Sequence, residues 1–321
     1  MTSDQVLPEF QAVDGAAFQA IVAGEHPAIL RGFVRHWPAV RRALASPEDL
    51  CGYLMECDSG APVDALLAGP QEQGRLFYSA GMKGFNFVRR KLPLSAVIEQ
   101  LARYSQFADP PSVAVQSALL DECAPRFARE HMLPFLDAAV RPRIWLGNTI
   151  TTPAHVDQSH NLACVVAGRR RFTLFPPDQV GNLYIGPLDF APTPTPISMV
   201  DFAQPDHARF PRFRQALAHA LVADLVPGDA LFIPTLWWHH VQSHGMLNML
   251  VNYWWQASAA VDVFDSMVAC MQALGALPPA QRRAWAALFG HYVFDPAHPG
   301  AHIDPHARGV LSGARPSGPA P

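Results

Sequence analysis

From about Val113 to Trp255 the sequence consists of short runs rich in Val, Ile, Phe and Leu, separated by proline and glycine. Such runs predict short β-strands, because a long amphipathic helix needs an uninterrupted apolar repeat every three to four residues. The whole chain has 31 prolines against 21 glycines, which also favours short elements and turns. We therefore expect an antiparallel β-sandwich or barrel in the middle of the chain.

Helical patterns precede this β-rich region. The stretch "DGAAFQAIVAG" predicts a helix capped by Asp14. The stretch "SPEDLCGYLMEC" predicts another, with Ser46 as N-cap, Pro47 at the first helical position and Asp49 closing a capping box. The runs "APVDALL" and "RLFYS" predict strands, and "SAVIEQLARY" predicts a further helix. The fold class that follows is mainly β with flanking helices.

The C-terminal part has a different pattern. The stretches "VDVFDSMVACMQAL" and "PAQRRAWAALFGHYVF" predict two helices, and the Pro, Gly and Ser content of "RGVLSGARPSGPAP" predicts disorder. We expect a domain over residues 1–258, a helical region over 259–305 and a disordered tail over 306–321. The first of these helices carries a wide apolar stripe at positions 263, 264, 267, 268, 271 and 274. Packing on the β-rich domain would cover this stripe, and so would a second copy of the chain.

Composition excludes several classes of protein. With 321 residues, half of them hydrophobic, the chain can bury one large core and a smaller appendage. The five cysteines are odd in number and lack ligand spacing, which argues against a disulfide framework or a zinc knuckle and for a reducing compartment. The first residues lack a signal-peptide pattern and no apolar run approaches membrane-spanning length, so we expect a cytoplasmic protein. A net charge of −3 makes nucleic acid an unlikely partner.

The stretch "TTPAHVDQSHN" places His155 and Asp157 two positions apart. On a strand these residues project from the same face, about 7 Å apart at their Cα atoms, so both side chains can reach one ion. A third ligand has to come from elsewhere, and "PTLWWHHVQSHG" offers adjacent histidines. Strand alternation puts His239 with Val241 and Ser243 on the less polar face, which we expect to point inward. His240 would then point outward.

Two imidazoles and one carboxylate leave three positions of an octahedral ion open, the arrangement of non-haem Fe(II) oxygenases. A His-x-Asp pair alone is weak evidence in a chain with 14 histidines. The run "GRRRFTLFPP" adds to it, since alternation places Arg170 on the apolar face and Arg169 and Arg171 on the other. An inward guanidinium needs an anionic partner, either a structural Asp or Glu or the distal carboxylate of a bound organic acid. The metal ligands and the inward arginine together favour the acid.

Three segments, "TTPAHVDQSHNLACVVAGRRRFTLFPPDQ", "PGDALFIPTLWWHH" and "VNYWW", resemble the cupin-like branch of the JmjC-type 2-oxoglutarate oxygenases, which includes asparaginyl hydroxylases. The resemblance implies a double-stranded β-helix (cupin or jelly-roll) core followed by a C-terminal helical segment. It also implies Fe(II) held by His155, Asp157 and His239, with 2-oxoglutarate as co-substrate and O2 as oxidant. The remaining residues that it assigns to the co-substrate pocket are Thr152 and Arg170 at the distal carboxylate, Asn161, Asn252, and the aromatic Trp254.

Two positions depart from the pattern of the asparaginyl hydroxylases. Where asparaginyl hydroxylases have a tyrosine that grips 2-oxoglutarate, this chain has Ala114 in "SVAVQSALL". Arg170 also stands where those enzymes have a lysine. Gln116, two residues after Ala114 and on the same strand face, is a candidate contact to the substrate, or else an ordinary edge-strand glutamine.

The function expected from these features is an Fe(II)- and 2-oxoglutarate-dependent hydroxylase that acts on a C–H of a protein side chain or a small molecule and releases succinate and CO2. The alternatives are a cupin that binds zinc or manganese, such as an isomerase, and a binding protein that has lost turnover. Ala114 is the feature that favours the last of these. The family resemblance further implies a homodimer formed by the C-terminal helices.

Overall fold

The computed structural model describes residues 6–255, 262–295, 297 and 299–312. Contacts divide the chain into two units, Met1–Ala257 and Ser258–Pro321. The first unit contains all eleven strands of the described chain. These are β1 Glu9–Gln11, β2 Ala28–Arg31, β3 Val63–Ala68, β4 Val88–Leu92, β5 Ser112–Leu119, β6 Pro142–Gly147, β7 Ile150–His155, β8 His160–Phe175, β9 Leu221–Leu225, β10 Ala230–Ile233 and β11 Trp238–Trp255.

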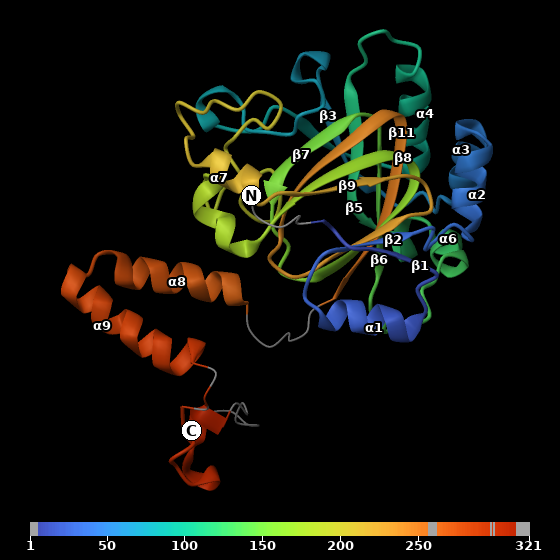
Figure 1. Ribbon diagram of the computed structural model, residues 1–321. Coiled ribbons are helices and arrows are strands. Elements are labelled where there is room, and N and C mark those ends of the chain that lie inside the picture. Colours follow the sequence, from blue (N-terminus) through green and yellow to red (C-terminus); the bar gives the residue numbers. More distant parts are fainter. Residues whose placement is uncertain (1–5, 256–261, 296, 298, 313–321) are drawn as a thin grey trace. The chain divides into compact units, whose positions relative to one another are not determined.

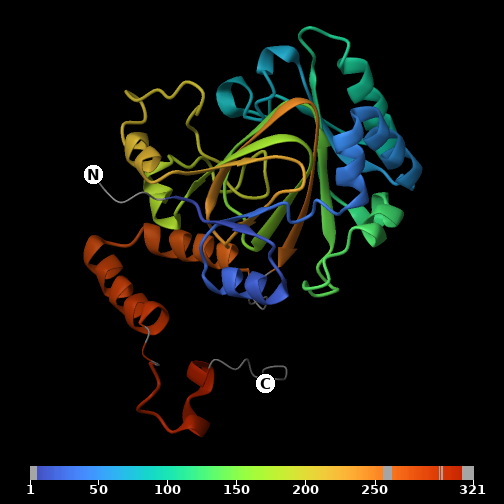
Figure 2. The same ribbon diagram turned by 45° about the vertical axis from the view of Figure 1, so that its right-hand side comes forward.

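Two long antiparallel strands, β8 and β11, organise this unit (Figures 1 and 2). The first half of β8 and the second half of β11 belong to a larger layer with the order β1-β2-β10-β8-β11-β6-β5-β3-β4. The other halves form a smaller layer with the order β9-β8-β11-β7. Two layers that share their central strands make a jelly-roll core, which confirms the mainly β, cupin-type fold expected from the sequence.

Both long strands change direction where they pass between the layers. In β8 the bend lies at Gly168, which has φ +76 and whose missing Cβ would overlap the side chain of Asn248. In β11 the pairing shifts register between His244 and Met249 and again before Leu250. A side chain at position 168 would have both a strained backbone and a clash, so glycine is required at this corner.

Seven helices of the first unit flank the strands in the described residues. They are α1 Gly15–Ala23, α2 Pro38–Ala45, α3 Pro47–Cys57, α4 Leu94–Tyr104, α5 Leu120–Cys123, α6 Pro125–Glu130 and α7 Phe213–Ala218. Residues from α1 to α6, such as Phe18, Leu54 and Phe127, share one buried cluster with Leu162 and Val251 of the larger layer. Figure 1 shows α2, α3, α4 and α6 along one side of the strands. A second cluster, which includes Val165 and Phe172, lies between the layers.

The predicted caps are present, with one correction. The Asp14 carboxylate accepts the Ala17 N–H at 2.8 Å, and the Ser46 hydroxyl accepts the Asp49 N–H at 3.1 Å. The Asp49 side chain does not close a capping box, because it forms an ion pair with Arg42 at 2.6 Å. A charged partner is a stronger attraction for the carboxylate than a single backbone N–H.

The prediction of a strand over "RLFYS" is wrong. Arg75 and Tyr78 form only isolated bridges, to Thr151 and Phe85. The side chain of Asn86 binds this backbone instead, accepting the Phe77 N–H at 2.8 Å and donating to the Arg75 carbonyl at 2.8 Å. A side-chain amide that satisfies the backbone in this way competes with a strand ladder.

The second unit is helical. Its main helices are α8 Val263–Gly275 and α9 Pro279–Phe289, and a turn of π-helix, Gly290–Phe294, follows directly. Short 3-10 helices cover Pro305–Ala307 and Gly309–Ser312. The rest of the predicted disordered tail, 313–321, lies outside the described residues. Within the described part of the chain, no helix has the length and apolar character needed to cross a bilayer.

Candidate functional site

A cavity of about 570 Å³ lies between the two layers of the jelly roll and has walls from both. Its lining residues include every site residue predicted from the sequence. These are Gln116, Thr152, His155, Asp157, Asn161, Arg170, His239, Asn252 and Trp254. Residues separated by up to 138 positions are therefore gathered at one place by the shared strands β8 and β11.

His155, Asp157 and His239 form a compact cluster in this cavity. His155 ends β7 and lies opposite His239 of β11 in the register of the two strands. The two imidazole rings are 4.3 Å apart at their centroids, and His239 Nε2 is 3.5 Å from Asp157 Oδ2. One ligand atom from each of the three residues lies within 4.8 Å of the others. This spacing allows all three atoms to bind one metal ion.

Both histidines are held in the form that a metal requires. His155 Nδ1 is 2.9 Å from the Pro153 carbonyl, and His239 Nδ1 is 3.0 Å from the Trp237 carbonyl. A carbonyl can only accept, so each Nδ1 carries the hydrogen and each neutral ring keeps its lone pair on Nε2. Burial, reinforced by the neighbouring His239, lowers the pKa of His155 to about 4. The His155 ring is therefore neutral and ready to bind a metal at physiological pH.

A chain of hydrogen bonds orients the carboxylate. Trp145 Nε1 donates to Asn252 Oδ1 at 2.9 Å, Asn252 Nδ2 donates to Asn161 Oδ1 at 3.3 Å, and Asn161 Nδ2 donates to Asp157 Oδ2 at 3.3 Å. Because the indole can only donate, the orientation of both amides follows from it. Residues that orient a ligand in this way tune the metal site.

Trp145 was not among the site residues predicted from the sequence. A signal was available in "PRIWLG", where Ile144 and Leu146 alternate with the polar or amphipathic Arg143 and Trp145. Ile144 and Leu146 are buried against the helices, which leaves Arg143 and Trp145 on the cavity side.

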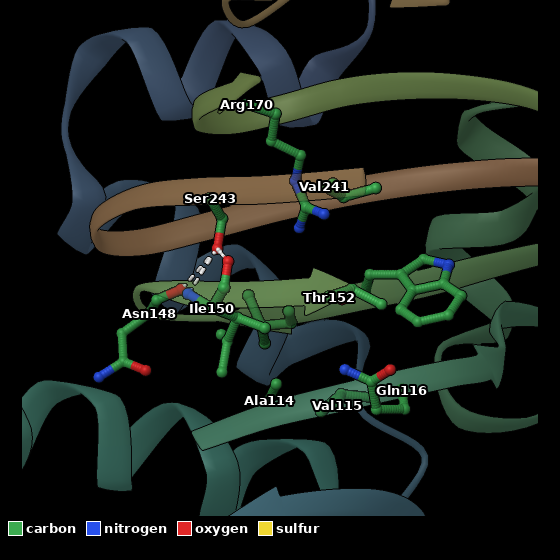
Figure 3. Close-up of a pocket in the computed structure, with 12 residues that line it drawn as sticks. Ala114, Val115, Gln116, Asn148, Ile150, Thr152, Arg170, Val241 and Ser243 are labelled. Carbon is green, nitrogen blue, oxygen red and sulfur yellow. Dashed lines mark hydrogen bonds between the residues drawn. The ribbon is translucent and has the colours of Figure 1, made fainter. Parts of the chain in front are cut away.

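Arg170 presents a positive charge to the same cavity. Figure 3 shows its side chain reaching from β8 past Val241 toward Thr152, with Gln116 on the opposite wall. Its Nε is fully buried without a hydrogen-bond partner, and no carboxylate of the described residues forms an ion pair with it. Burial lowers the pKa of Arg170 to about 10, so the group remains charged near neutral pH. An unpaired guanidinium at such a place calls for an anionic ligand.

The residues that follow Arg170 and His239 on their strands face away from the cavity. Arg171 is exposed and forms a bidentate pair with Asp224, with both N–O distances 2.7 Å. His240 is buried on the other side of β11, where its ring stacks on Phe202 at 4.3 Å. The structure thus places His239 in the cluster, as strand alternation indicates, and leaves His240 outside it.

Figure 3 shows Ala114 and Gln116 opposite Arg170 in a small pocket that shares Gln116, Thr152 and Arg170 with the 570 Å³ cavity; Ala114 lines the small pocket and not that cavity. Ala114 is 4% exposed and packs in an apolar cluster with Leu66 and Ile150. It offers no polar group, so a co-substrate at this wall has fewer side-chain contacts than the family pattern implies. Gln116 reaches the main cavity.

Comparison with known proteins agrees with this arrangement. A family model described as "Cupin-like domain" matches residues 15–260. "Jumonji C domain-containing protein 5" of Drosophila melanogaster is 28% identical over 263 residues, which is 80% of this chain and 61% of that protein. "Lysine-specific demethylase 8" of Xenopus tropicalis is 26% identical over 234 residues, 72% of this chain and 48% of that protein.

A shorter match has a higher identity. "HSPB1-associated protein 1" of Homo sapiens is 37% identical over 113 residues, 35% of this chain and 22% of that protein. The chain thus spans less than two thirds of the length of each of these relatives. The family model, however, covers every described strand except β1, together with the helices α1 to α7. The chain belongs to the cupin-like domain family, with Jumonji C proteins among its relatives.

Proposed function

We propose that the chain is an Fe(II)- and 2-oxoglutarate-dependent hydroxylase. The observation that carries this proposal is the presence, in one cavity, of a His–Asp–His cluster and the unpaired guanidinium of Arg170. The cluster would supply three ligands to the ion, which would leave positions for a co-substrate and O2. Two relatives named as lysine-specific demethylases support the reaction class, since oxidative removal of an N-methyl group starts with hydroxylation of its C–H.

In this reaction a substrate C–H, O2 and 2-oxoglutarate give a hydroxylated substrate, succinate and CO2. One oxygen atom of O2 ends in the new hydroxyl group and the other in the succinate carboxylate. Bound Fe(II) supplies the redox chemistry that links the loss of CO2 to the attack on the C–H bond.

The protein's own residues have three tasks. His155, Asp157 and His239 hold the ion through two neutral imidazoles and one carboxylate, and the amide chain from Trp145 keeps the carboxylate oriented. Arg170, with the Thr152 hydroxyl beside it, holds the distal carboxylate of 2-oxoglutarate. Apolar side chains of the same wall, such as Phe172, keep water from the reacting groups.

The alternative is a metal-binding cupin without oxygenase turnover, which Ala114 favours because it removes a contact to the co-substrate. Succinate release separates the two. We would incubate the protein with Fe(II), 2-oxoglutarate and O2, with a cell extract as source of substrate, and compare it with Asp157→Ala. We expect succinate from the native protein only. Metal binding with no succinate above the Asp157→Ala level would support the alternative.

We also propose a homodimer formed through the C-terminal helices. Within α8 the apolar residues Val263, Met267 and Met271 are exposed, and Trp285 and Leu288 of α9 are exposed as well. Exposed apolar side chains at helical spacing are typical of an interface. The double variant Met267→Glu/Met271→Glu of the full chain should have the mass of a monomer in light scattering. An unchanged mass for this variant, or a monomeric native protein, would contradict the dimer.

A further inference from the structure

Three arginines line the cavity, and they differ in their partners. Arg89 forms an ion pair with Asp64 at 2.9 Å and donates to the Pro192 carbonyl at 3.1 Å. Arg170 is unpaired and serves the co-substrate in the proposed function. Arg143, on β6, is the third, and no carboxylate of the described residues forms an ion pair with it. The proposed function assigns no role to the positive charge of Arg143.

The Arg143 guanidinium is fixed in place. Its Nη1 donates to the Ser117 carbonyl at 3.0 Å and to the Ser117 hydroxyl at 3.3 Å. The ring of Trp254 lies below it, with 5.4 Å from Cζ to the ring centroid. Nε and Nη2 have no partner among the described residues. These two atoms form the edge of a guanidinium that binds a carboxylate or a phosphate with two parallel hydrogen bonds.

The backbone that holds Arg143 is unusual. Ser117 has φ +53, and the pairing of β5 with β6 shifts register between Val115 and Ala118. A bulge with a non-glycine residue in the left-handed region costs free energy, and such features cluster at functional sites. Here the bulge brings both Ser117 oxygens to Arg143.

Acidic residues close in sequence are not available to Arg143. Arg141 forms ion pairs with both Asp121 and Glu122, at 2.6 and 2.7 Å. Burial lowers the pKa of Arg143, and no opposite charge within the described residues offsets this in an ion pair. The Arg143 guanidinium is therefore a partly desolvated cation that is already oriented toward the cavity and can bind an anion there.

Arg143 lines the same cavity as the metal ligands. In the register of β6 and β11 it lies opposite Asn252, the residue whose amide leads through Asn161 to Asp157. Directly opposed residues of antiparallel strands are about 5 Å apart at their Cα atoms. An anion on the free edge of Arg143 would thus lie in the cavity that also holds His155, Asp157 and His239.

The sum of the charges in the cavity, with Fe(II) and 2-oxoglutarate bound, indicates whether a ligand of Arg143 is positive or negative. Fe(II), the Asp157 carboxylate, the Arg170 guanidinium and doubly charged 2-oxoglutarate cancel one another, and Arg89 and Asp64 cancel as a pair. Arg143 is the charge left over. On the basis of the proposed function, we propose that Arg143 determines substrate specificity by binding an anionic group, a carboxylate or a phosphate, of the molecule that is hydroxylated.

The test uses three small probes that differ only in the group offered to Arg143: N-acetylglutamate amide, N-acetyl-O-phosphoserine amide and the neutral N-acetylglutamine amide. Each is titrated by calorimetry into the full chain loaded with Zn(II) and saturated with 2-oxoglutarate, where no turnover occurs. We expect at least one charged probe to bind about tenfold or more tightly than the neutral one. Which charged probe binds best distinguishes a carboxylate from a phosphate.

Three variants test whether Arg143 is the residue that causes the preference for a charged probe. Arg143→Met should remove the preference for charge, and Arg143→Lys should restore part of it. Arg89→Met is the matched control, because Arg89 lines the same cavity but is already paired with Asp64; its effect on the preference should be less than about threefold. Melting temperatures show whether each variant is folded. No preference for charge in the native protein, or a preference that survives Arg143→Met, would overturn the proposal.

The affinity for 2-oxoglutarate keeps this test separate from the proposed function. If Arg143→Met weakens 2-oxoglutarate binding and leaves probe binding unchanged, Arg143 is a co-substrate residue and the proposal is wrong. If the native protein does not bind 2-oxoglutarate, the proposed function fails. The same probes titrated without metal and 2-oxoglutarate still decide whether Arg143 binds an anion.

Discussion

The two faces of the smaller layer use the same residue types for different purposes. On the inner face Arg170 is buried and unpaired, and His239 joins the metal-ligand cluster. On the outer face Arg171 forms an exposed pair with Asp224, and His240 stacks on Phe202. Each comparison involves adjacent residues on one strand. A shift of one position therefore separates a functional group from a structural one, because side chains alternate between faces.

A side chain that binds a ligand can be recognised by the absence of a partner within the protein. An exposed pair such as Arg171 with Asp224 costs little and contributes about 0–1 kcal/mol. A buried guanidinium without a partner is costly to the free protein. Because Arg170 Nε is buried without a partner, we expect the partner of this guanidinium to arrive with a ligand.

The largest difference between the faces should appear in metal binding. His239→Ala removes one of three ligands, so we expect Fe(II) affinity to fall by more than about a hundredfold, since residues that only orient a ligand already change it 10–100-fold. His240→Ala should leave metal affinity nearly unchanged. Anaerobic calorimetry with Fe(II) measures both variants. Loss of the metal from His240→Ala, with retention in His239→Ala, would reverse the assignment of the two faces.

The affinity for 2-oxoglutarate should separate the two arginines. Arg170→Met leaves the distal carboxylate unpaired, so we expect binding about ten- to hundredfold weaker, as a charge-assisted hydrogen bond contributes roughly 1.5–3 kcal/mol. Arg170→Lys should recover part of the lost affinity, since lysine restores the positive charge but cannot form the bidentate pair of hydrogen bonds. Arg171→Met is the matched control on the outer face and should bind normally. Calorimetry of the Zn(II)-loaded proteins gives the affinities, and equal values for all variants would make Arg170 purely structural.

The buried histidines predict an acid-sensitive metal-free protein. Burial lowers the pKa of His155 to about 4 and that of His240 to about 3. Between these values and about 6.5 the unfolded chain binds more protons than the folded one, so stability falls as the pH falls through this range and is unaffected above it. Each histidine contributes roughly 3–5 kcal/mol. Urea unfolding from pH 8 to pH 4 should show a shallower decline for His240→Gln than for the native protein; parallel curves would exclude a role for His240.

The smallest effect concerns the outer face alone. A double-mutant cycle with Arg171→Met and Asp224→Asn should give a coupling of about 0–1 kcal/mol, reduced further by salt. Urea unfolding at low and at high ionic strength provides the measurement. A coupling above about 2 kcal/mol would show that exposure does not separate the two arginines as we describe.

Strand alternation predicted the parts of the site that lie within one straight segment. It placed His239 and Arg170 inward and His240 and Arg171 outward. Alternation could not predict which residues face the cavity beyond the corners of the jelly roll, where the long strands change layer. Counted from His239, strict alternation would turn Val251 and Tyr253 into the cavity, but these two pack against the helices and Asn252 lines the cavity.

The change of face results from the register shifts between His244 and Leu250. A local extra residue reverses alternation for everything that follows, and its position depends on long-range packing that a local pattern does not contain. Asn252 and Trp254 were reached through the family resemblance alone. Arg143 was missed for a similar reason, since its importance depends on the bulge at Ser117 and on the absence of a carboxylate partner.

The central claim is that the metal-ligand cluster and Arg170 together serve one molecule of 2-oxoglutarate. An oxygen-free titration of the Fe(II)-loaded protein with 2-oxoglutarate tests it directly, because a keto acid that chelates Fe(II) gives a visible metal-to-ligand absorption band. We predict a band that saturates at one equivalent and is absent in Asp157→Ala. A protein that binds Fe(II) at His155, Asp157 and His239 but develops no band with 2-oxoglutarate would contradict the account.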